Sequence, residues 1–261
     1  MKRSLIDRLP EVVPDEIRDF AEGAQIYDSS SSGSARVYFI DKDEGYYLKS
    51  ATSGMLAREA EMTKYYHSLG LGARVLDYIS EGGDFLLVSR VPGEDCIHPD
   101  FLREPKRLTD TVAIALRRLH ETDFSACPIK DRTAEYISLA EENYRTGNYD
   151  SSHFPDSFGY RSADEAIRAL REGRELLRCD TLIHGDYCLP NIMLDNWRLS
   201  GFIDVGCGGV GDRHIDIFWA LWSLAFNLGT DSYTDRFLDA YGRDRVDMRA
   251  LRTVAAAEVF G

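Results

Sequence analysis

The chain has 261 residues, of which 44% are hydrophobic, and it carries a formal net charge of −13. This length and composition allow a sizeable buried core, organised as one large domain or as two lobes. The acidic balance argues against nucleic acid as a partner, because phosphate backbones are bound by lysine and arginine. It suits a cationic small molecule, although negative charge can also simply keep a protein in solution.

The spacing of the cysteines and the lengths of the apolar runs indicate in which cellular compartment the protein is expected. The five cysteines are scattered and form no C-x-x-C pair, so we expect reduced thiols rather than a disulfide framework. Charged residues precede any apolar core near the start of the chain, which predicts no signal peptide. No run approaches the ~18 apolar residues of a membrane span. We therefore expect a cytoplasmic protein with no membrane partner.

The first part of the chain has the pattern of short strands and one helix. Alternating apolar residues predict strands at residues 35–40, 46–49, 75–79 and 85–91. A partial apolar stripe between them predicts a helix from Leu56 to Leu69. Pro92 and Gly93 then interrupt the pattern, so we expect an N-terminal lobe at residues 1–91.

The remainder of the chain is mainly helical in pattern. One-sided apolar spacing predicts a helix from Leu108 to Leu119, and a capping-box pattern at residues 162–165 opens another. The segment from Ile215 to Leu228 is almost continuously apolar, and we predict a buried helix there. The expected fold is α+β and bilobal, with a small antiparallel-sheet lobe and a larger helical lobe at residues 92–261.

The segment from His184 to Asn191 carries the strongest chemical signal. Asp186 and Asn191 are separated by the D-x-x-x-x-N step of the protein-kinase catalytic loop, and Asp204 follows a short predicted hairpin. In that arrangement the first Asp accepts a proton from the attacking hydroxyl, while Asn and the second Asp hold magnesium against ATP. Single residues of these kinds are common in turns and caps, but three at this spacing favour a catalytic site. We expect His184 to be a scaffold residue whose ring hydrogen-bonds near Asp204.

Lys49 ends the second predicted strand, ten residues before Glu59 in the predicted helix. A lysine at a strand end is usually a solvated charge. Together with the downstream loop, Lys49 and Glu59 match the strand-lysine and helix-glutamate pair that positions the α- and β-phosphates of ATP. Glu61 is an alternative partner, which the helical phase does not exclude.

Several weaker features complete the predicted nucleotide site of the N-terminal lobe. A serine-rich segment at residues 28–34 is either a linker or a loop that covers phosphates with backbone amides and hydroxyls. Residues 88–91 precede the Pro-Gly break and would meet the adenine edge through their backbone. Tyr47 is either a stacking partner for adenine or ordinary core. The predicted nucleotide contacts beyond Lys49 and Glu59 are Tyr47, Ser30, Ser31, Ser32, Ser89, Val91 and Ile203.

These residues resemble a known family, the aminoglycoside 3'-phosphotransferases. The similarity is carried by residues 184–193, 200–204, 209–213 and 216–217, and it covers most of the chain apart from about residues 130–175. It implies a protein-kinase-like fold, ATP and Mg²⁺ as co-substrate and cofactor, and transfer of the γ-phosphate to an antibiotic hydroxyl. It also implies Asp186 as catalytic base and Asn191 and Asp204 as metal ligands.

The sequence departs from this family at the acceptor. Cys207 stands where an arginine is common, and Trp222, Ser223 and Phe226 stand where Arg, Asp and Glu are expected. The predicted acceptor-binding residues are Asp150, Asp156, Glu258 and Phe260. Fewer acids favour a narrower set of aminoglycosides or a less cationic hydroxylated acceptor, with stacking on Trp222 or Phe226 as compensation. A nucleotide-binding protein without catalysis is the third alternative, which the intact catalytic positions disfavour.

Overall fold

A computed structural model describes residues 3–30, 33, 35–150 and 159–261. The chain forms two compact units. The first unit reaches Gly93 and also includes the short segments Met193–Asn196 and Ser200–Gly206. The rest of the described chain forms the second unit. Asp204 therefore packs with the first unit, whereas the lobe boundary predicted at residue 91 places it in the second lobe.

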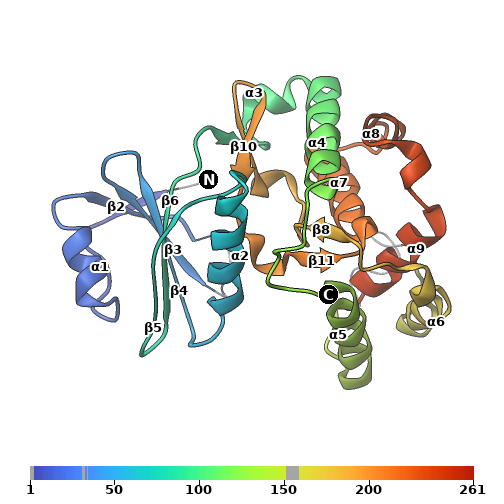
Figure 1. Ribbon diagram of the computed structural model, residues 1–261, viewed down its shortest axis with the longest axis horizontal. Coiled ribbons are helices and arrows are strands. Elements are labelled where there is room, and N and C mark those ends of the chain that lie inside the picture. Colours follow the sequence, from blue (N-terminus) through green and yellow to red (C-terminus); the bar gives the residue numbers. More distant parts are fainter. Residues whose placement is uncertain (1–2, 31–32, 34, 151–158) are drawn as a thin grey trace. The chain divides into compact units, whose positions relative to one another are not determined.

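The first unit is built on an antiparallel sheet of six strands in the order β1-β2-β3-β4-β6-β5 (Figure 1). The predicted hairpin and the two later strands are present as β3 to β6. The strand bounds are β1 Ser4–Ile6, β2 Gln25–Asp28, β3 Arg36–Asp41, β4 Tyr46–Ala51, β5 Val75–Ser80 and β6 Asp84–Ser89.

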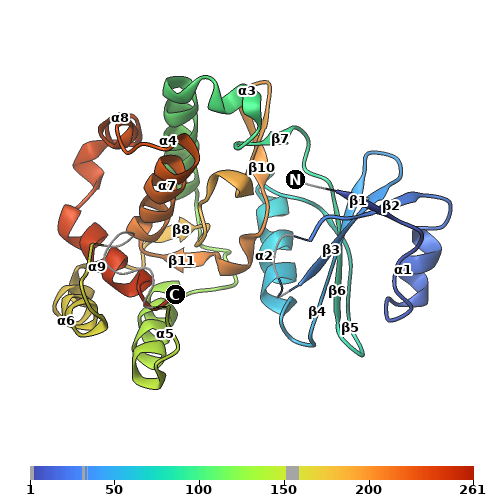
Figure 2. The ribbon, with the colours of Figure 1, turned by 180° about the vertical axis from the view of Figure 1, so that it is seen from behind.

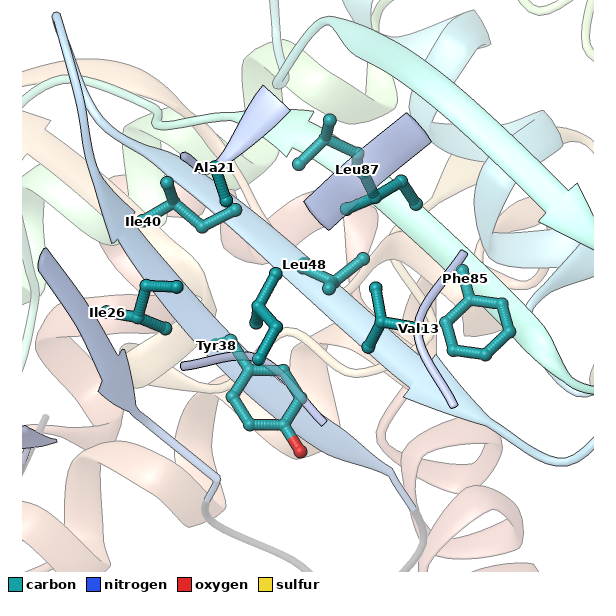
Figure 3. Close-up of a cluster of buried hydrophobic side chains, with 10 residues drawn as sticks. Val13, Ala21, Ile26, Tyr38, Ile40, Leu48, Phe85 and Leu87 are labelled. Atoms are coloured by element: carbon teal, nitrogen blue, oxygen red, sulfur yellow. The ribbon is translucent and has the colours of Figure 1, made fainter. Parts of the chain in front are cut away.

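Helices α1 (Asp15–Phe20) and α2 (Ala57–Ser68) cover opposite faces of this sheet (Figure 1). Leu48 of β4 is fully buried in the apolar cluster beneath α1 (Figure 3). Because successive side chains of a strand point to opposite faces, Lys49 projects on the α2 side. The sheet thus buries Leu48 and presents Lys49 to α2.

The second unit is mainly helical, and its strands are short. The helices are α3 Pro99–Leu102, α4 Pro105–His120, α5 Arg132–Thr146, α6 Ala163–Gly173, α7 Arg213–Leu228, α8 Thr234–Tyr241 and α9 Met248–Glu258. The strands β8 (Thr181–Ile183) and β11 (Gly209–Gly211) pair antiparallel, and β7 is Glu94–Asp95. As predicted, Ser162 caps α6 by accepting the N–H of Glu165.

The predicted short hairpin before Asp204 is also present. Strands β9 (Ile192–Asp195) and β10 (Arg198–Phe202) are neighbours, and the two residues between them, Asn196 and Trp197, both have positive φ. Two central residues with positive φ are typical of a type I′ turn, which matches the twist of the flanking strands.

Helix α7 packs against α4 and α9 in the second unit (Figure 2). The buried helix predicted at residues 215–228 is present as α7, but only part of its surface is buried. Ile215, Ile217 and Leu224 are buried, but Trp219 and Trp222 are only partly covered and Phe226 is 71% exposed. Continuous apolar sequence gave no indication of which face the neighbouring helices cover. Within the described residues, no helix is long and apolar enough to cross a membrane.

Candidate active site

The loop that carries Asp186 follows β8, and its second residue, Gly185, is one that no other residue could replace without strain. Gly185 has φ +82°, and a Cβ there would lie 2.0 Å from the carbonyl oxygen of Cys207. Both the left-handed backbone and the close approach favour glycine. The glycine before Asp186 is therefore required by the backbone conformation and packing of the loop, in addition to the chemistry expected of Asp186.

Asp216 of α7 holds the start of this loop. Its carboxylate is fully buried and accepts the N–H of His184 at 2.8 Å and the N–H of Gly185 at 2.7 Å. The ring of His120 lies 3.1 Å from the same carboxylate and 2.8 Å from the hydroxyl of Tyr241. Burial lowers the pKa of His120, so the neutral ring donates to Asp216 and accepts from Tyr241. No role for Asp216 was predicted from the sequence, although an acid within an apolar helix is a signal for one.

Ser223, two turns further along α7, holds the other end of the loop. Its buried hydroxyl accepts the N–H of Leu189 at 2.9 Å. The thiol of Cys188 lies beside Ser223 and Asp186, and burial with the neighbouring carboxylate raises the pKa of this thiol. This environment favours the neutral thiol of Cys188. One helix fixes the loop on both sides of Asp186.

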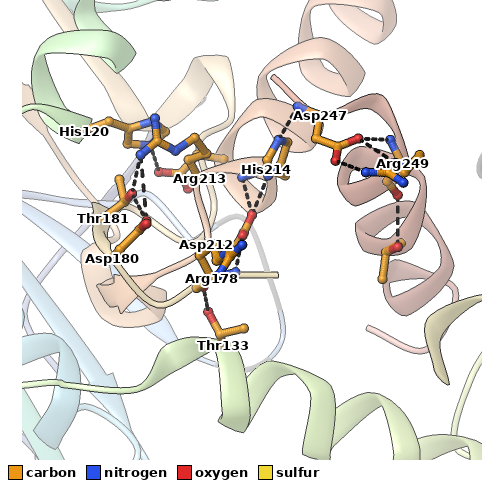
Figure 4. Close-up of polar contacts among 12 residues, drawn as sticks. His120, Thr133, Arg178, Asp180, Thr181, Asp212, Arg213, His214, Asp247 and Arg249 are labelled. Carbon is orange, nitrogen blue, oxygen red and sulfur yellow. Dashed lines mark hydrogen bonds and ion pairs between the residues drawn. The ribbon is translucent and has the colours of Figure 1, made fainter. Parts of the chain in front are cut away.

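The N-terminus of α7 is itself fixed by a polar network (Figure 4). Asp212 caps the helix by accepting the N–H of His214 at 2.7 Å, and it also accepts the N–H of Arg178 at 2.6 Å. The ring of His214 lies 2.7 Å from Asp212 and accepts the N–H of Asp247 at 3.0 Å. This network ties α7 to the residue that caps α9.

Asn191 orients Asp186. The side-chain amide of Asn191 donates to the carboxylate of Asp186 at 2.9 Å and to its backbone carbonyl at 3.0 Å. Both bonds use the amide nitrogen, so the amide oxygen remains as the ligand atom that a hard cation prefers. The ring of His184 is fully buried and accepts the N–H of Asp186 at 3.3 Å, which supports a scaffold role. Its expected hydrogen bond near Asp204 stays a prediction.

In the first unit, Lys49 forms ion pairs with both Glu59 and Asp204. Burial disfavours the charged ammonium, but the two carboxylates outweigh it and raise the pKa of Lys49. Glu61 is exposed, so Glu59 is the partner in this structure. Asp204 follows β10 with φ +58°, an uncommon conformation for a residue other than glycine.

The donor set fits Mg²⁺, which prefers a few carboxylate or amide oxygens and retains several waters. Asp204 offers a carboxylate that is roughly half exposed, and Asn191 offers its amide oxygen. The two residues belong to different units, so their joint use remains a prediction. Among the described residues, no group of three or more His, Cys, Asp and Glu could hold a metal ion.

The serines predicted to contact the nucleotide lie in different surroundings. Ser30 is bound locally, since its N–H donates to Asp28 and its hydroxyl accepts the N–H of Val37. The Ser89 N–H donates to the Arg74 carbonyl in the sheet. Ser31 and Ser32 lie outside the described residues.

The remaining nucleotide candidates include one aromatic ring. The ring of Tyr47 packs at 5.1 Å from that of Phe39, and its hydroxyl accepts from Arg3 at 2.6 Å. Val91 is buried, and Ile203 is partly buried immediately before Asp204. Nucleotide contacts at these positions remain predictions.

The residues predicted to bind the acceptor lie in different environments. Glu258 is 7% exposed, and its carboxylate accepts from the Tyr136 hydroxyl at 2.8 Å. Burial raises the pKa of Glu258 to about 7, against hydrogen bonding from Tyr136 and Trp219, and the nearby charge of Asp186 adds to the increase. Neither Tyr136 nor Trp219 was singled out from the sequence.

Phe260 requires a correction. Its ring is fully buried and packs edge-on against Tyr144 and Tyr149, so it belongs to the core and cannot present its side chain to an acceptor. Asp150 is exposed, and Asp156 lies outside the described residues. Cys207, which the sequence comparison with the resembled family singled out because an arginine is common there, is exposed.

The chain is similar in sequence and in structure to known phosphotransferases. The model of the phosphotransferase enzyme family matches residues 29–252. A probable aminoglycoside 3'-phosphotransferase of Lactococcus lactis subsp. lactis (strain IL1403) is 49% identical over 98% of this chain and 96% of its own length. A streptomycin 3''-kinase of Streptomyces griseus is 34% identical over 67% of this chain and 66% of its own length. The crystal structure of a type VIII aminoglycoside-3'-phosphotransferase is 25% identical, with a TM-score of 0.77 over 94% of this chain and 97% of that one.

Proposed function

The chain belongs to the phosphotransferase enzyme family, and we propose that it transfers the γ-phosphate of ATP to the 3'-hydroxyl of an aminoglycoside antibiotic. The relative at 49% identity, which spans almost the whole chain, supports this acceptor and this position. The expected α+β, protein-kinase-like fold is confirmed by the solved relative. The observation that carries the proposal is the carboxylate of Asp186, oriented by Asn191 in a loop that α7 fixes at both ends.

Asp186 is the proposed catalytic base. Its carboxylate would accept the proton of the acceptor hydroxyl as that oxygen forms a bond to the γ-phosphorus and the bond to ADP breaks. A positioned base of this kind contributes roughly 10²- to 10⁴-fold to a rate. The bonds from Asn191 and the fixed backbone on either side keep the carboxylate in one orientation before the acceptor arrives, which avoids part of the cost of ordering it.

Lys49 is the proposed phosphate-binding cation of the first unit. The ammonium group would hold the α- and β-phosphates, and Glu59 would keep it in place. Magnesium, when bound, neutralises charge that develops on the phosphates. Asn191 and Asp204 are the residues that would hold it.

Glu258 is the proposed contact for an ammonium group of the acceptor. It lies near Asp186, and a cation beside it would favour the ionised carboxylate. The net charge of −13 would also draw a polycation toward the protein. Because ATP is supplied in the cytoplasm, we propose that the enzyme acts there and protects the cell against the antibiotic.

The test is a comparison of matched aminoglycosides with and without a 3'-hydroxyl. The purified protein should release ADP with the first compound only, and phosphorus NMR of the product should show a phosphate ester at the 3'-oxygen. Cells that express the protein should tolerate only the first compound. Equal turnover of both compounds would move the reaction to another hydroxyl, and turnover of neither would reject the proposal.

A further inference from the structure

The chain before β11 meets the catalytic loop at the carbonyl of Cys207. Strands β8 and β11 pair with Ile183 opposite Gly209, and Gly185 and Cys207 lie two residues beyond this pair on either side. A Cβ on Gly185 would lie 2.0 Å from the Cys207 carbonyl oxygen. The hydrogen that glycine has in this direction therefore points at the oxygen, as in a weak C–H···O contact. The residue before Asp186 thus rests on the Cys207 carbonyl.

Arg132, the first residue of α5, holds this carbonyl in place. Its Nε–H donates to the carbonyl oxygen of Cys207 at 3.0 Å. Its hydrocarbon stem lies across β11, where a Cβ on Gly209 would be 2.5 Å from the Cγ of Arg132. An ion pair with Glu135, one turn along α5, further fixes the guanidinium. The side chain of Arg132 is only 16% exposed, so it is ordered before any substrate binds.

The start of α5 is itself held against the same part of the fold. The N–H of Val210 in β11 donates to the carbonyl of Ile129 at 2.9 Å. The hydroxyl of Thr133 donates to the carbonyl of Arg178 at 2.7 Å. All of these residues belong to the second unit. Arg132 therefore reaches the Cys207 carbonyl from a backbone that is fixed beside it.

Helices α5 and α7 act on different sides of Gly185. Asp216 of α7 accepts the N–H of Gly185, whereas the carbonyl that Arg132 holds meets its Cα. A glycine backbone has more conformational freedom than that of any other residue, so one contact alone leaves the loop room to turn at this position. The two contacts together fix the backbone from which the carboxylate of Asp186 projects.

We propose that Arg132 is a positioning residue for the phosphoryl transfer. Through the Cys207 carbonyl it holds the backbone before Asp186, and so determines where the carboxylate meets the acceptor hydroxyl. Arg132 touches no substrate in this role, so it acts on the rate of the chemical step and not on the binding of ATP or the acceptor. Because a neutral carbonyl accepts the bond, the N–H group of Arg132 matters and its charge does not. This inference rests on the proposed function, since Asp186 is the base of that reaction.

Arg132→Met tests this role, because Met keeps an unbranched stem over β11 and removes the donor. The kcat should fall about tenfold or more, since a misplacement of about 1 Å can cost as much as 100-fold. The KM values for ATP and for the aminoglycoside should stay within about twofold of wild type. Arg132→Gln places an amide N–H at the same number of bonds from the backbone as Nε, so it should restore most of the kcat without the charge. Arg145→Met is the matched control with unchanged kcat, because Arg145 also pairs with an acid three residues away in α5, Glu142.

Hydrogen exchange gives a readout that needs no turnover. The amides of Gly185 and Asp186 should exchange faster in Arg132→Met than in the wild type, and Arg132→Gln should return them to the wild-type rate. Unchanged exchange in Arg132→Met, or raised KM values together with the lower kcat, would overturn the inference and leave the proposed function intact. Should Arg132→Met fail to fold, a tenfold lower kcat in Arg132→Gln would overturn it as well. If the wild type phosphorylates no aminoglycoside, the proposed function falls, and this role falls with it.

Discussion

Asn191 donates two hydrogen bonds to Asp186, one to its carboxylate at 2.9 Å and one to its backbone carbonyl at 3.0 Å. The buried amide of Asn191 thus holds the side chain of Asp186, the proposed base, in a fixed position relative to the backbone of Asp186. The same geometry leaves the amide oxygen of Asn191 for a cation. One residue therefore serves two proposed functions, orienting the base and holding the metal.

Replacing Asn191 by Ala should lower kcat by about 100-fold or more, because it frees the base and removes a metal ligand. The Mg²⁺ concentration that gives half-maximal activity should also rise. Steady-state kinetics across a magnesium titration measures both effects. Asn148→Ala, at an exposed position, should leave both quantities unchanged. A kcat within twofold of wild type in Asn191→Ala would show that the amide orients nothing of consequence.

Lys49 and Glu59 should be energetically coupled. Their side chains are only 16% and 15% exposed, so Lys49→Met removes an ammonium group from beside a largely covered carboxylate. That variant should lose about 1–3 kcal/mol of unfolding free energy, and Lys49→Met/Glu59→Gln should lose less than the sum of the single changes. Urea unfolding of the four proteins measures the coupling. Strictly additive losses would mean that the ion pair does not stabilise the first unit.

Glu258 should make the stability of the protein depend on pH. Its pKa rises from 4.5 to about 7 on folding, so the folded protein retains a proton that the unfolded chain releases. The stabilisation by the protonated form is complete below about pH 4.5 and disappears as the pH rises through 7. Relative to Glu258→Gln, the wild type should therefore lose up to about 3 kcal/mol between pH 4.5 and 8. An unfolding free-energy difference that is constant over this range would contradict the shift.

Gly185→Ala should abolish activity and destabilise the fold. The new methyl group would lie 2.0 Å from the Cys207 carbonyl oxygen, at a residue whose φ is +82°. We expect a loss of more than about 2 kcal/mol in unfolding free energy. Gly147→Ala is the matched control: φ there is +72°, but nothing lies within 4 Å of the added carbon. It should cost about 1 kcal/mol, and equal losses in the two variants would exclude the close approach as the cause.

The catalytic motif could be predicted from the sequence because its residues are close together in the chain. The spacing from Asp186 to Asn191 lies within one loop, and the alternation around Lys49 determines which sheet face it occupies. The choice of Glu59 over Glu61 required the structure, because the two lie on opposite sides of the helix and the sequence does not show which side faces Lys49. The strands β3 to β6 were likewise recognisable from their alternation.

Other features depend on contacts between distant segments. Asp216 holds His184 and Gly185 from 31 or 32 positions away in the chain, and no local pattern specifies such a contact. Phe260 resembled an acceptor contact by its place near the end of the chain, but α5 provides the tyrosine that helps bury it. The exposed side of α7 was not expected from the predicted burial of this helix, because composition alone cannot separate a helix buried on all sides from one with an exposed apolar face.

The most direct test of the central claim is the turnover of Asp186→Asn together with its affinity for ATP. The variant keeps the size of the side chain and removes its ability to accept a proton. We predict that kcat with a 3'-hydroxyl aminoglycoside falls at least about 100-fold, while the Kd for ATP measured by calorimetry stays within about threefold of the wild-type value. A variant that binds ATP normally and keeps more than a tenth of the wild-type kcat would contradict the assignment of Asp186 as the base.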